Sequence, residues 1–294
     1  MNKKIFRVLV IAFTGTCIFL FYTFYNEVKN TAIRHINETQ LVHAKVAARG
    51  IEGYFANWTG VLNALSKTDD IISNNADGKR LMKLLYEAHQ NEILSINRVN
   101  EKGIIIYSSY GNTKIGADIS GLKHIQQLLK HHQTIISDMF TTVEGANTIS
   151  LNVPIFKGTN FIGSIGILIN YQNIAKRYLD EIKIGKTGHA WVISHDGTEL
   201  YSPEPGFTGK SIFENLKGYP SFTPMLNEML KGHQGYATYQ FDRASGEKTK
   251  LTTKLAVYVP VHLRNTFWSI VVVSNQEEAL SSLVSFRNRL ILIM

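Results

Sequence analysis

The sequence predicts an α+β protein in which a long helix precedes two similar modules, each an antiparallel sheet with helices beside it. Three observations support this prediction. Two segments about ninety residues apart, Asn100–Ser108 and Ser194–Ser202, follow one template. The segments around them alternate apolar and polar residues with the period of a β-strand. A helical segment without proline comes before both copies.

Each copy of the repeat begins with a hairpin. The segments N-E-K-G-I-I-I-Y-S and S-H-D-G-T-E-L-Y-S both place a glycine, Gly103 or Gly197, four residues before Tyr-Ser. Glycine supplies the positive φ that such turns often need, so residues 93–108 and 190–202 are each predicted to form two strands joined by a tight turn. Both copies later reach Val-Pro followed by Ile or Val, with a phenylalanine seven residues after the proline. A repeat of this kind predicts two similar domains.

The strands after the hairpins differ in their expected burial. Asn147–Phe156 alternates apolar and polar residues, which predicts a half-buried strand whose polar face lines a cavity. Ser164–Ile169 is apolar almost throughout and is expected to be covered on both faces. The remaining predicted elements are three strands of the second copy and one helix in each copy: Tyr236–Phe241, Leu251–Val259, Phe267–Val273, Leu122–His132 and Ser221–Leu230.

The N-terminal region predicts a membrane anchor. Ile5–Tyr25 is apolar over about 21 residues, which is long enough to cross a hydrocarbon core of ~30 Å as a helix. Basic residues in and before this run place residues 1–4 in the cytoplasm and the modules outside. A cleaved signal peptide is the alternative, although no small-x-small site closes the apolar run. Residues 279–294 end in L-I-L-I-M and are expected to begin a second transmembrane helix of a longer chain, the alternative being a short apolar tail.

Composition limits the possible functions. The formal net charge of +8 includes three basic residues at the predicted anchor, and the others are scattered. No basic stripe with interleaved aromatics is present, so we expect no nucleic-acid partner. The only cysteine, Cys17, lies in the predicted span, so each module is expected to depend on its own hydrophobic core rather than on a disulfide. No arrangement of nucleophile, base and orienting acid and no completed metal-ligand cluster is recognisable, so we expect neither catalysis nor a cofactor or metal.

Residues 26–68 are predicted to form a long helix between the anchor and the modules. One apolar stripe on it follows a spacing of four, three, four and three residues: Ile51, Phe55, Trp58, Leu62 and Leu65. The stripe either packs on its own module or forms a dimer seam. Ile33 and Ile36, nearer the membrane, are expected to contact a second copy, so a homodimer through this helix is predicted.

Several further segments are informative together: D-I-S from Asp118, I-S-D-M-F from Ile136, T-I-S-L-N-V-P-I from Thr148, G-K-T-G-H-A-W-V-I from Gly185, D-G-T-E-L-Y-S-P from Asp196, and the last V-P-V with Trp268. With these segments the chain resembles the double Cache domain, a tandem PAS-like sensor outside the membrane in bacterial transmembrane receptors. The resemblance implies a membrane-distal module at residues 69–178, which binds a small molecule, and a membrane-proximal module at residues 179–278. It also implies an inner-membrane receptor with its sensor in the periplasm or outside the cell, and a histidine kinase, cyclic-di-GMP enzyme or chemotaxis domain beyond a second span. The chain itself is expected not to be an enzyme.

The sequence departs from the subset of this family that binds amino acids through an arginine, aromatics and a last-strand aspartate. With Asp118 as the reference, the arginine position falls near Leu122 and an aromatic position near His124. The aspartate position falls on Leu168, while Phe140 keeps an aromatic. Both charged anchors for a zwitterion are therefore missing. We expect weak or no binding of ordinary α-amino acids.

The expected pocket combines an aromatic wall with a few polar groups, which suits a small polar or weakly aromatic metabolite. The candidate ligand-binding residues are Tyr107, Tyr110, His124, Asp138, Phe140, Ser150 and Asn152. For Tyr107, His124 and Asp138 a structural or surface role is the alternative. If His124 faces the ligand, its titration near neutral pH would make binding pH-dependent.

Two other features are interpreted as structural. Arg98 is expected on a strand face with Leu94 and Ile96, where it either anchors an anionic ligand or forms a structural ion pair. Gly185-Lys186-Thr187 looks like the end of a P-loop, but the earlier glycine position holds Asp180, so no phosphate cradle is predicted.

The alternative to a ligand sensor is a scaffold ectodomain that recognises a periplasmic protein.

Overall fold

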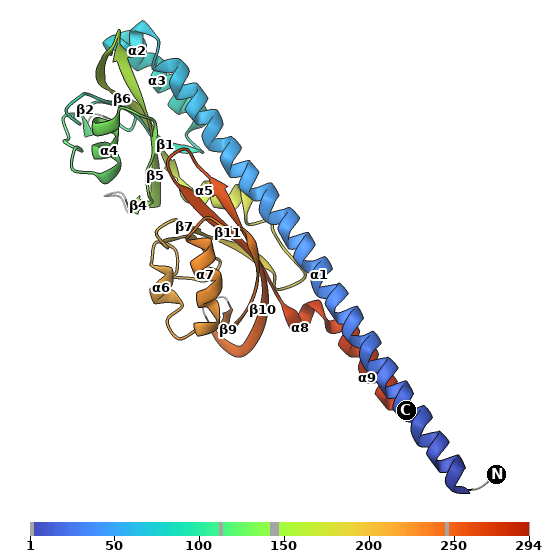
Figure 1. Cartoon of the computed structure of the whole chain (residues 1–294). Helices are drawn as coiled ribbons and strands as arrows, with labels where there is room; N and C mark the ends of the chain where they lie inside the picture. The colour runs from blue at the N-terminus through green and yellow to red at the C-terminus, as the bar shows by residue number, and fades with distance from the viewer. Residues whose placement is uncertain (1–2, 112–113, 142–146, 245–246, 294) are drawn as a thin grey trace.

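The molecule is built along one helix. The computed structural model places residues 3–111, 114–141, 147–244 and 247–293. Helix α1 (Lys3–Leu65) runs the length of the molecule, and two sheets with their own helices lie along its C-terminal half (Figure 1). The long N-terminal helix and the two antiparallel modules confirm the predicted fold class.

The distal module follows α1 directly. Its elements are α2 (Asp69–Ser73), α3 (Ala76–His89), β1 (Ile93–Val99), β2 (Ile105–Ser108), α4 (Lys123–His131), β3 (Ile135–Ile136), β4 (Phe140–Thr141), β5 (Asn147–Lys157), β6 (Asn160–Asn170) and α5 (Tyr171–Tyr178). In the described residues the sheet order is β2-β1-β6-β5-β3, with β4 also pairing with β5, and all pairs are antiparallel.

The proximal module repeats this arrangement. Its elements are β7 (His189–Ser194), β8 (Glu199–Tyr201), α6 (Ile212–Asn215), a 3-10 turn (Pro220–Phe222), α7 (Thr223–Met229), β9 (Gly235–Ala244), β10 (Glu247–His262), β11 (Phe267–Asn275), α8 (Gln276–Ala279) and α9 (Ser281–Ile293). The order β8-β7-β11-β10-β9 follows the same pattern as the distal sheet. Gly103 and Gly197 both have φ of 83° in their turns, as the hairpin prediction requires.

The later strands follow the predicted positions, with one difference in burial. β6 is buried on both faces over most of its length, as expected. β5 is also buried on both faces from Thr148 to Val153, where a half-buried strand was expected, and its polar residues Ser150 and Asn152 line a cavity, as predicted. The polar face is covered because α4 and the chain that leads into it lie over this side of the sheet (Figure 1).

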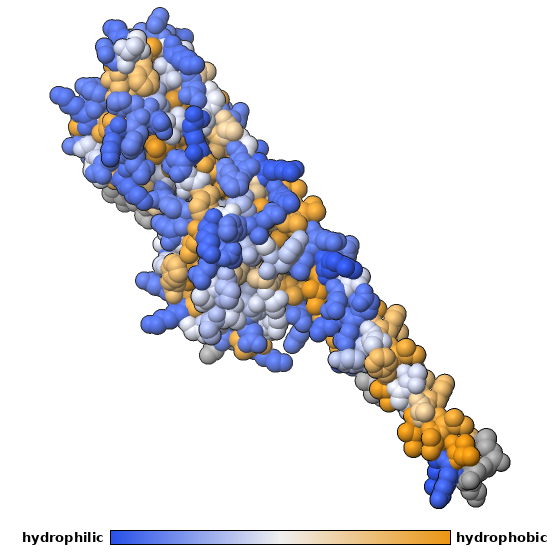
Figure 2. Space-filling view, viewed as in Figure 1, coloured by the Kyte–Doolittle hydropathy of each residue, from blue (hydrophilic) through white to orange (hydrophobic). Residues whose placement is uncertain are grey.

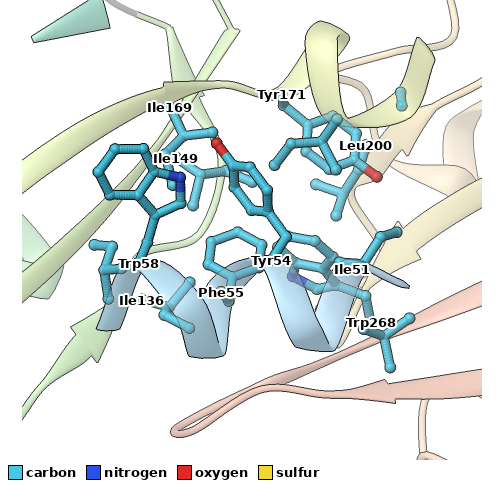
Figure 3. Close-up of a cluster of buried hydrophobic side chains, with 14 of the residues drawn as sticks. Ile51, Tyr54, Phe55, Trp58, Ile136, Ile149, Ile169, Tyr171, Leu200 and Trp268 are labelled. Carbon is cyan, nitrogen blue, oxygen red and sulfur yellow. The ribbon is translucent and has the colours of Figure 1, made fainter. Parts of the chain in front are cut away.

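The apolar stripe of α1 packs on the protein's own sheets. Ile51, Phe55, Trp58 and Leu62 are each at most 2% exposed, so the dimer-seam alternative is wrong for these four residues. Figure 3 shows Ile51, Phe55 and Trp58 among side chains of both modules. The Phe55 ring meets the Trp268 ring of the proximal sheet edge to face at 5.4 Å between centroids.

The expectation of a separate core for each module is therefore wrong. One continuous cluster joins the α1-facing sides of both sheets, from Ile149 and Ile169 in the distal sheet to Val257 and Ile270 in the proximal sheet. A second cluster fills the proximal module beneath α6 and α7, and a small third one lies under α4. The core is shared because α1 is long enough to cover one face of both sheets.

Arg98 has a structural role other than either one expected. Its side chain is 2% exposed, and burial lowers its pKa to about 10. Its guanidinium donates to backbone carbonyls, at 2.5–3.3 Å, of Ile71, Val99, Ile162 and Ser164. Arg98 thus ties α2 to the end of β1 and the start of β6 instead of holding an anion or a carboxylate.

The N-terminal end of α1 is the apolar helix that the sequence predicts, a candidate membrane span. Within Lys4–Leu65, an 18-residue window reaches a mean hydropathy of 2.1, and none of it is buried. Figure 2 shows the hydrophobic residues of this end exposed at its surface. The part of α9 that is described has 13 residues and lies beside α1, with the Arg287 guanidinium 5.8 Å from the Tyr25 ring. The second span stays a prediction.

Candidate ligand-binding site

A cavity of about 360 Å³ lies over the distal sheet, on the side away from α1. Its floor is a row of paired residues on three adjacent strands. Asn97 of β1 and Asn152 of β5 both pair with Gly166 of β6. In the next row, Ser95 and Ser150 both pair with Leu168 of β6. The same polar residue types therefore flank the central strand on both sides.

Each asparagine of the floor is held by the serine two residues before it. Asn97 Nδ2 donates to Ser95 Oγ at 3.0 Å, and Asn152 Nδ2 donates to Ser150 Oγ at 2.7 Å. Gly166 makes room for this arrangement, because a Cβ there would collide with Asn152 Oδ1. Asn97 Oδ1 is buried and accepts no hydrogen bond from the described residues. The floor thus offers a free, preoriented amide acceptor, and a buried polar atom of this kind calls for a partner.

The walls of the cavity are mostly apolar. His124 at the start of α4 stacks on Phe140 of β4, with 5.4 Å between ring centroids and 22° between planes. Ile125, Ile119 and Leu122 continue this wall. Lys114 is the one charged side chain among the described residues that line the cavity, and it has an interaction partner.

This geometry agrees with the comparison against protein families, in which the Cache domain model matches residues 24–283. The chain belongs to the Cache domain family. Cache domains are extracellular sensor domains of membrane receptors and bind ligands without catalysis. The comparison with curated proteins gave no match.

Solved Cache-domain structures share the fold at low sequence identity. An extracellular ligand-binding receptor from Desulfohalobium retbaense is 19% identical with a TM-score of 0.63, the match covering 80% of this chain and 40% of that one. The ligand-binding domain of the Pseudomonas aeruginosa amino acid chemoreceptor PctB, in complex with L-Arg, is 16% identical with a TM-score of 0.65 and coverages of 84% and 97%. The extracellular domain of the putative histidine kinase mmHK1S-Z2 is 15% identical with a TM-score of 0.62 and coverages of 83% and 98%.

In this Cache-domain chain, five of the seven predicted site residues line the cavity: Tyr110, His124, Phe140, Ser150 and Asn152. Tyr107 does not. It pairs with Arg98 and packs against the core on the α1 side of the sheet, where burial, with the Glu87 carboxylate, raises the pKa of Tyr107. Asp138 lies in an adjoining cleft, where its carboxylate accepts from Lys123 Nζ at 2.7 Å and lies 3.7 Å from His195 Nδ1.

Sequence reasoning missed half of the floor. Ser95 and Asn97 lie on β1, where Arg98 was the residue considered for ligand binding. A signal was present, since Ser95 and Asn97 interrupt the apolar residues that precede Arg98. A register shift between Ile93 and Ser95 obscured it, because it breaks the simple alternation of faces along the strand.

The proximal module of the Cache domain fills the corresponding space with aromatic side chains. Tyr258 stands two residues before Pro260, as Asn152 stands two residues before Pro154. Tyr258 and Trp191 both pair with Val271 of the central strand β11, as the two asparagines of the distal floor both pair with Gly166, and both aromatic residues are buried. The pocket left beside Trp191 is about 40 Å³. The two modules therefore share a topology but not a cavity.

His124 is uncharged at neutral pH. Burial lowers its pKa to about 4, although the nearby Asp138 carboxylate opposes the shift. The expected titration near neutral pH is therefore wrong, since the imidazole stacks on Phe140 away from water. A neutral His124 still offers one donor and one acceptor nitrogen.

The low pKa of His124 predicts a pH dependence of folding stability. Between pH 6.5 and 4 the unfolded chain binds a proton at this position and the folded chain does not, so the free energy of unfolding falls as pH falls, by at most about 3 kcal/mol. His124→Gln should remove much of this loss in urea titrations across that pH range. His131→Gln changes an exposed histidine of the same helix and should leave the wild-type slope. An equal slope in the wild type and His124→Gln would contradict the assignment.

Proposed function

We propose that this chain is the sensor region of an inner-membrane receptor and that it binds a small molecule in the distal cavity. The observation that carries the proposal is a cavity with a polar floor and apolar walls in the distal module of a Cache-domain chain. The two modules would lie in the periplasm or outside the cell. The receptor would be a histidine kinase, a cyclic-di-GMP enzyme or a chemoreceptor, and we assign any catalytic step to a domain outside these residues.

The lining supports an uncharged ligand. The positions at which amino-acid-binding relatives would place their charged anchors are Leu122 and Leu168, and both contribute apolar surface to the cavity. The buried acceptor Asn97 Oδ1 favours a ligand with a hydrogen-bond donor, because leaving that oxygen unpaired costs free energy. The stacked rings of His124 and Phe140 favour an apolar or weakly aromatic body beside it. A zwitterion would lose its hydration there without gaining a charged partner.

A thermal-shift screen of amides, alcohols, purines, amines, organic acids and amino acids tests this proposal. A ligand at 100 times its Kd should stabilise the folded chain by ~2.7 kcal/mol. We expect a hit among the uncharged compounds, and no micromolar binding of any α-amino acid by calorimetry.

Variants then locate the site. Phe140→Ala and Asn152→Ala should weaken binding of the hit by roughly tenfold or more, since each removes a direct contact or a polar anchor. Tyr107→Phe, on the other face of the same sheet, should bind as the wild type does. A hit that survives both cavity variants would contradict the distal site. The absence of any shift across the panel would favour the scaffold alternative.

We further propose that two copies associate through the membrane-side part of α1 and that ligand binding changes their relation. The stripe from Ile51 to Leu62 packs against the protein's own sheets. Nearer the N-terminus, Ile33 and Ile36 are only half-buried, and Val42 and Val46 are more than 60% exposed, so these apolar side chains are accessible to a second copy. A ligand shifts such an equilibrium only through its differential affinity for the two states.

Disulfide crosslinking tests the dimer. In a Cys17→Ser background, Ile36→Cys should form a covalent dimer under mild oxidation at a rate that changes when the screened ligand is added. Lys210→Cys, an exposed site on the proximal module, should not crosslink. An Ile36→Cys chain that stays monomeric would contradict the dimer. A crosslinking rate that is the same with and without the ligand would contradict the proposal that ligand binding changes the relation of the two copies.

A further inference from the structure

The proximal module carries a second hollow that is unlike the distal cavity. It is a cleft of about 570 Å³ between the segment after α5 and the inner strands β7 and β10, and no described residue lines both. This volume is in the range of sites for small molecules.

Basic side chains dominate the lining of this cleft. Four lysines line it: Lys183, Lys186, Lys250 and Lys254. The carboxylates at the cleft are Asp180 and Glu204. Asp180 accepts a hydrogen bond from the Tyr201 hydroxyl, so part of its charge is already engaged within the protein. The balance of charge in the cleft is positive, which favours an anion.

Lys254 distinguishes the cleft from a surface with scattered lysines. It is 7% exposed and pairs with Asn275 across β10 and β11, at the floor of the cleft. Within the described residues, no hydrogen bond and no ion pair reaches its ammonium group. Burial lowers the pKa of Lys254, and the charges of Glu204 and Glu278 only partly oppose this. The stem of Lys254 is therefore buried while its ammonium reaches the cleft, where three donors without a protein acceptor favour a bound anion.

The rim of the same cleft already binds a carboxylate. Glu278 of α8 accepts from the backbone amides of Lys186 and Thr187, the second at 3.0 Å, and from Thr187 Oγ1 at 2.5 Å. Gly185, at φ 66°, allows this close approach, because a Cβ there would collide with the Glu278 carboxylate. The Gly-Lys-Thr segment is therefore a carboxylate-binding turn, which agrees with the absence of a complete phosphate loop.

We propose that this cleft is a second ligand site, which binds a small soluble carboxylate with Lys254 as its central anchor. The site is independent of the distal cavity. Its floor residue Asn275 ends β11, and Glu278 at its rim belongs to α8, which leads into α9. A carboxylate bound there lies close to α8, which connects the proximal module to α9. It would either compete with the Glu278 carboxylate for the amides of Lys186 and Thr187 or strengthen that contact.

Calorimetric titration of the purified full chain in detergent with succinate tests this site, with inorganic phosphate as a second arm. We expect succinate to bind the wild type more tightly than phosphate does. Lys254→Met, which keeps the apolar stem, should weaken succinate binding at least tenfold, and Lys254→Arg should restore part of it. Lys217→Met removes an exposed lysine of the same module and should bind as the wild type does.

Two further readouts keep the test interpretable. Lys254→Met without anion should unfold at the wild-type temperature or above it, because it removes a partly desolvated charge that no described residue pairs with, so lost binding would not reflect lost folding. Phe140→Ala in the distal cavity should keep succinate binding. Succinate binding that is unchanged in Lys254→Met, or no binding of succinate to the wild type, would overturn the proposal, and preferential binding of phosphate would overturn its carboxylate selectivity.

Discussion

The packing of one helical stripe against two sheets is the constraint on which the rest of this structure depends. Phe55 and Tyr171 both meet Trp268 edge to face at 5.4 Å between centroids. Ile51 and Trp58 belong to the same cluster and are almost completely buried. Burial of large side chains is the main favourable term in folding, so both sheets are fixed to the helix whose N-terminal part is the candidate membrane span. Neither module can move far without disturbing a core that the other module shares.

Because of this arrangement, one face of each sheet belongs to the shared core and the other face differs between the two modules. The α1-facing sides are apolar in both modules and form the shared core. The opposite sides are free to differ, so the distal sheet carries asparagines and serines under a cavity, while the proximal sheet carries Trp191 and Tyr258 in a filled core. Beneath the helices that cover each sheet, the distal module therefore holds a cavity and the proximal module a packed core.

A small polar contact joins the wall of the distal cavity to the proximal module. Asn265, in the turn between β10 and β11, accepts from the Ile136 amide at 2.8 Å and donates to the Ile136 carbonyl at 2.9 Å. Ile136 ends β3, four residues before Phe140 of the cavity wall. This contact therefore links that wall to the β10–β11 hairpin, whose strands pack on α1.

Much of the fold follows from local pattern, and the misses follow from contacts that no local pattern contains. Period-two alternation and the turn glycines Gly103 and Gly197 locate strands because they depend on neighbouring residues only. Tyr107 was assigned to the wrong face because strand irregularities shift the alternation. The shared core joins residues about 200 positions apart, such as Phe55 and Trp268, and the low pKa of His124 arises from burial under other elements. Both require the tertiary structure.

The continuity of the core is tested most directly by native-state hydrogen exchange in wild type and Phe55→Ala. Truncation of a buried Phe costs about 3–5 kcal/mol, and in a shared core that loss reaches both sheets. We predict that the amides of Ile165–Ile169 in β6 and of Ile270–Val272 in β11 lose protection together and by similar amounts. Loss of protection in β11 alone, with β6 unchanged, would show two independent cores and contradict the account.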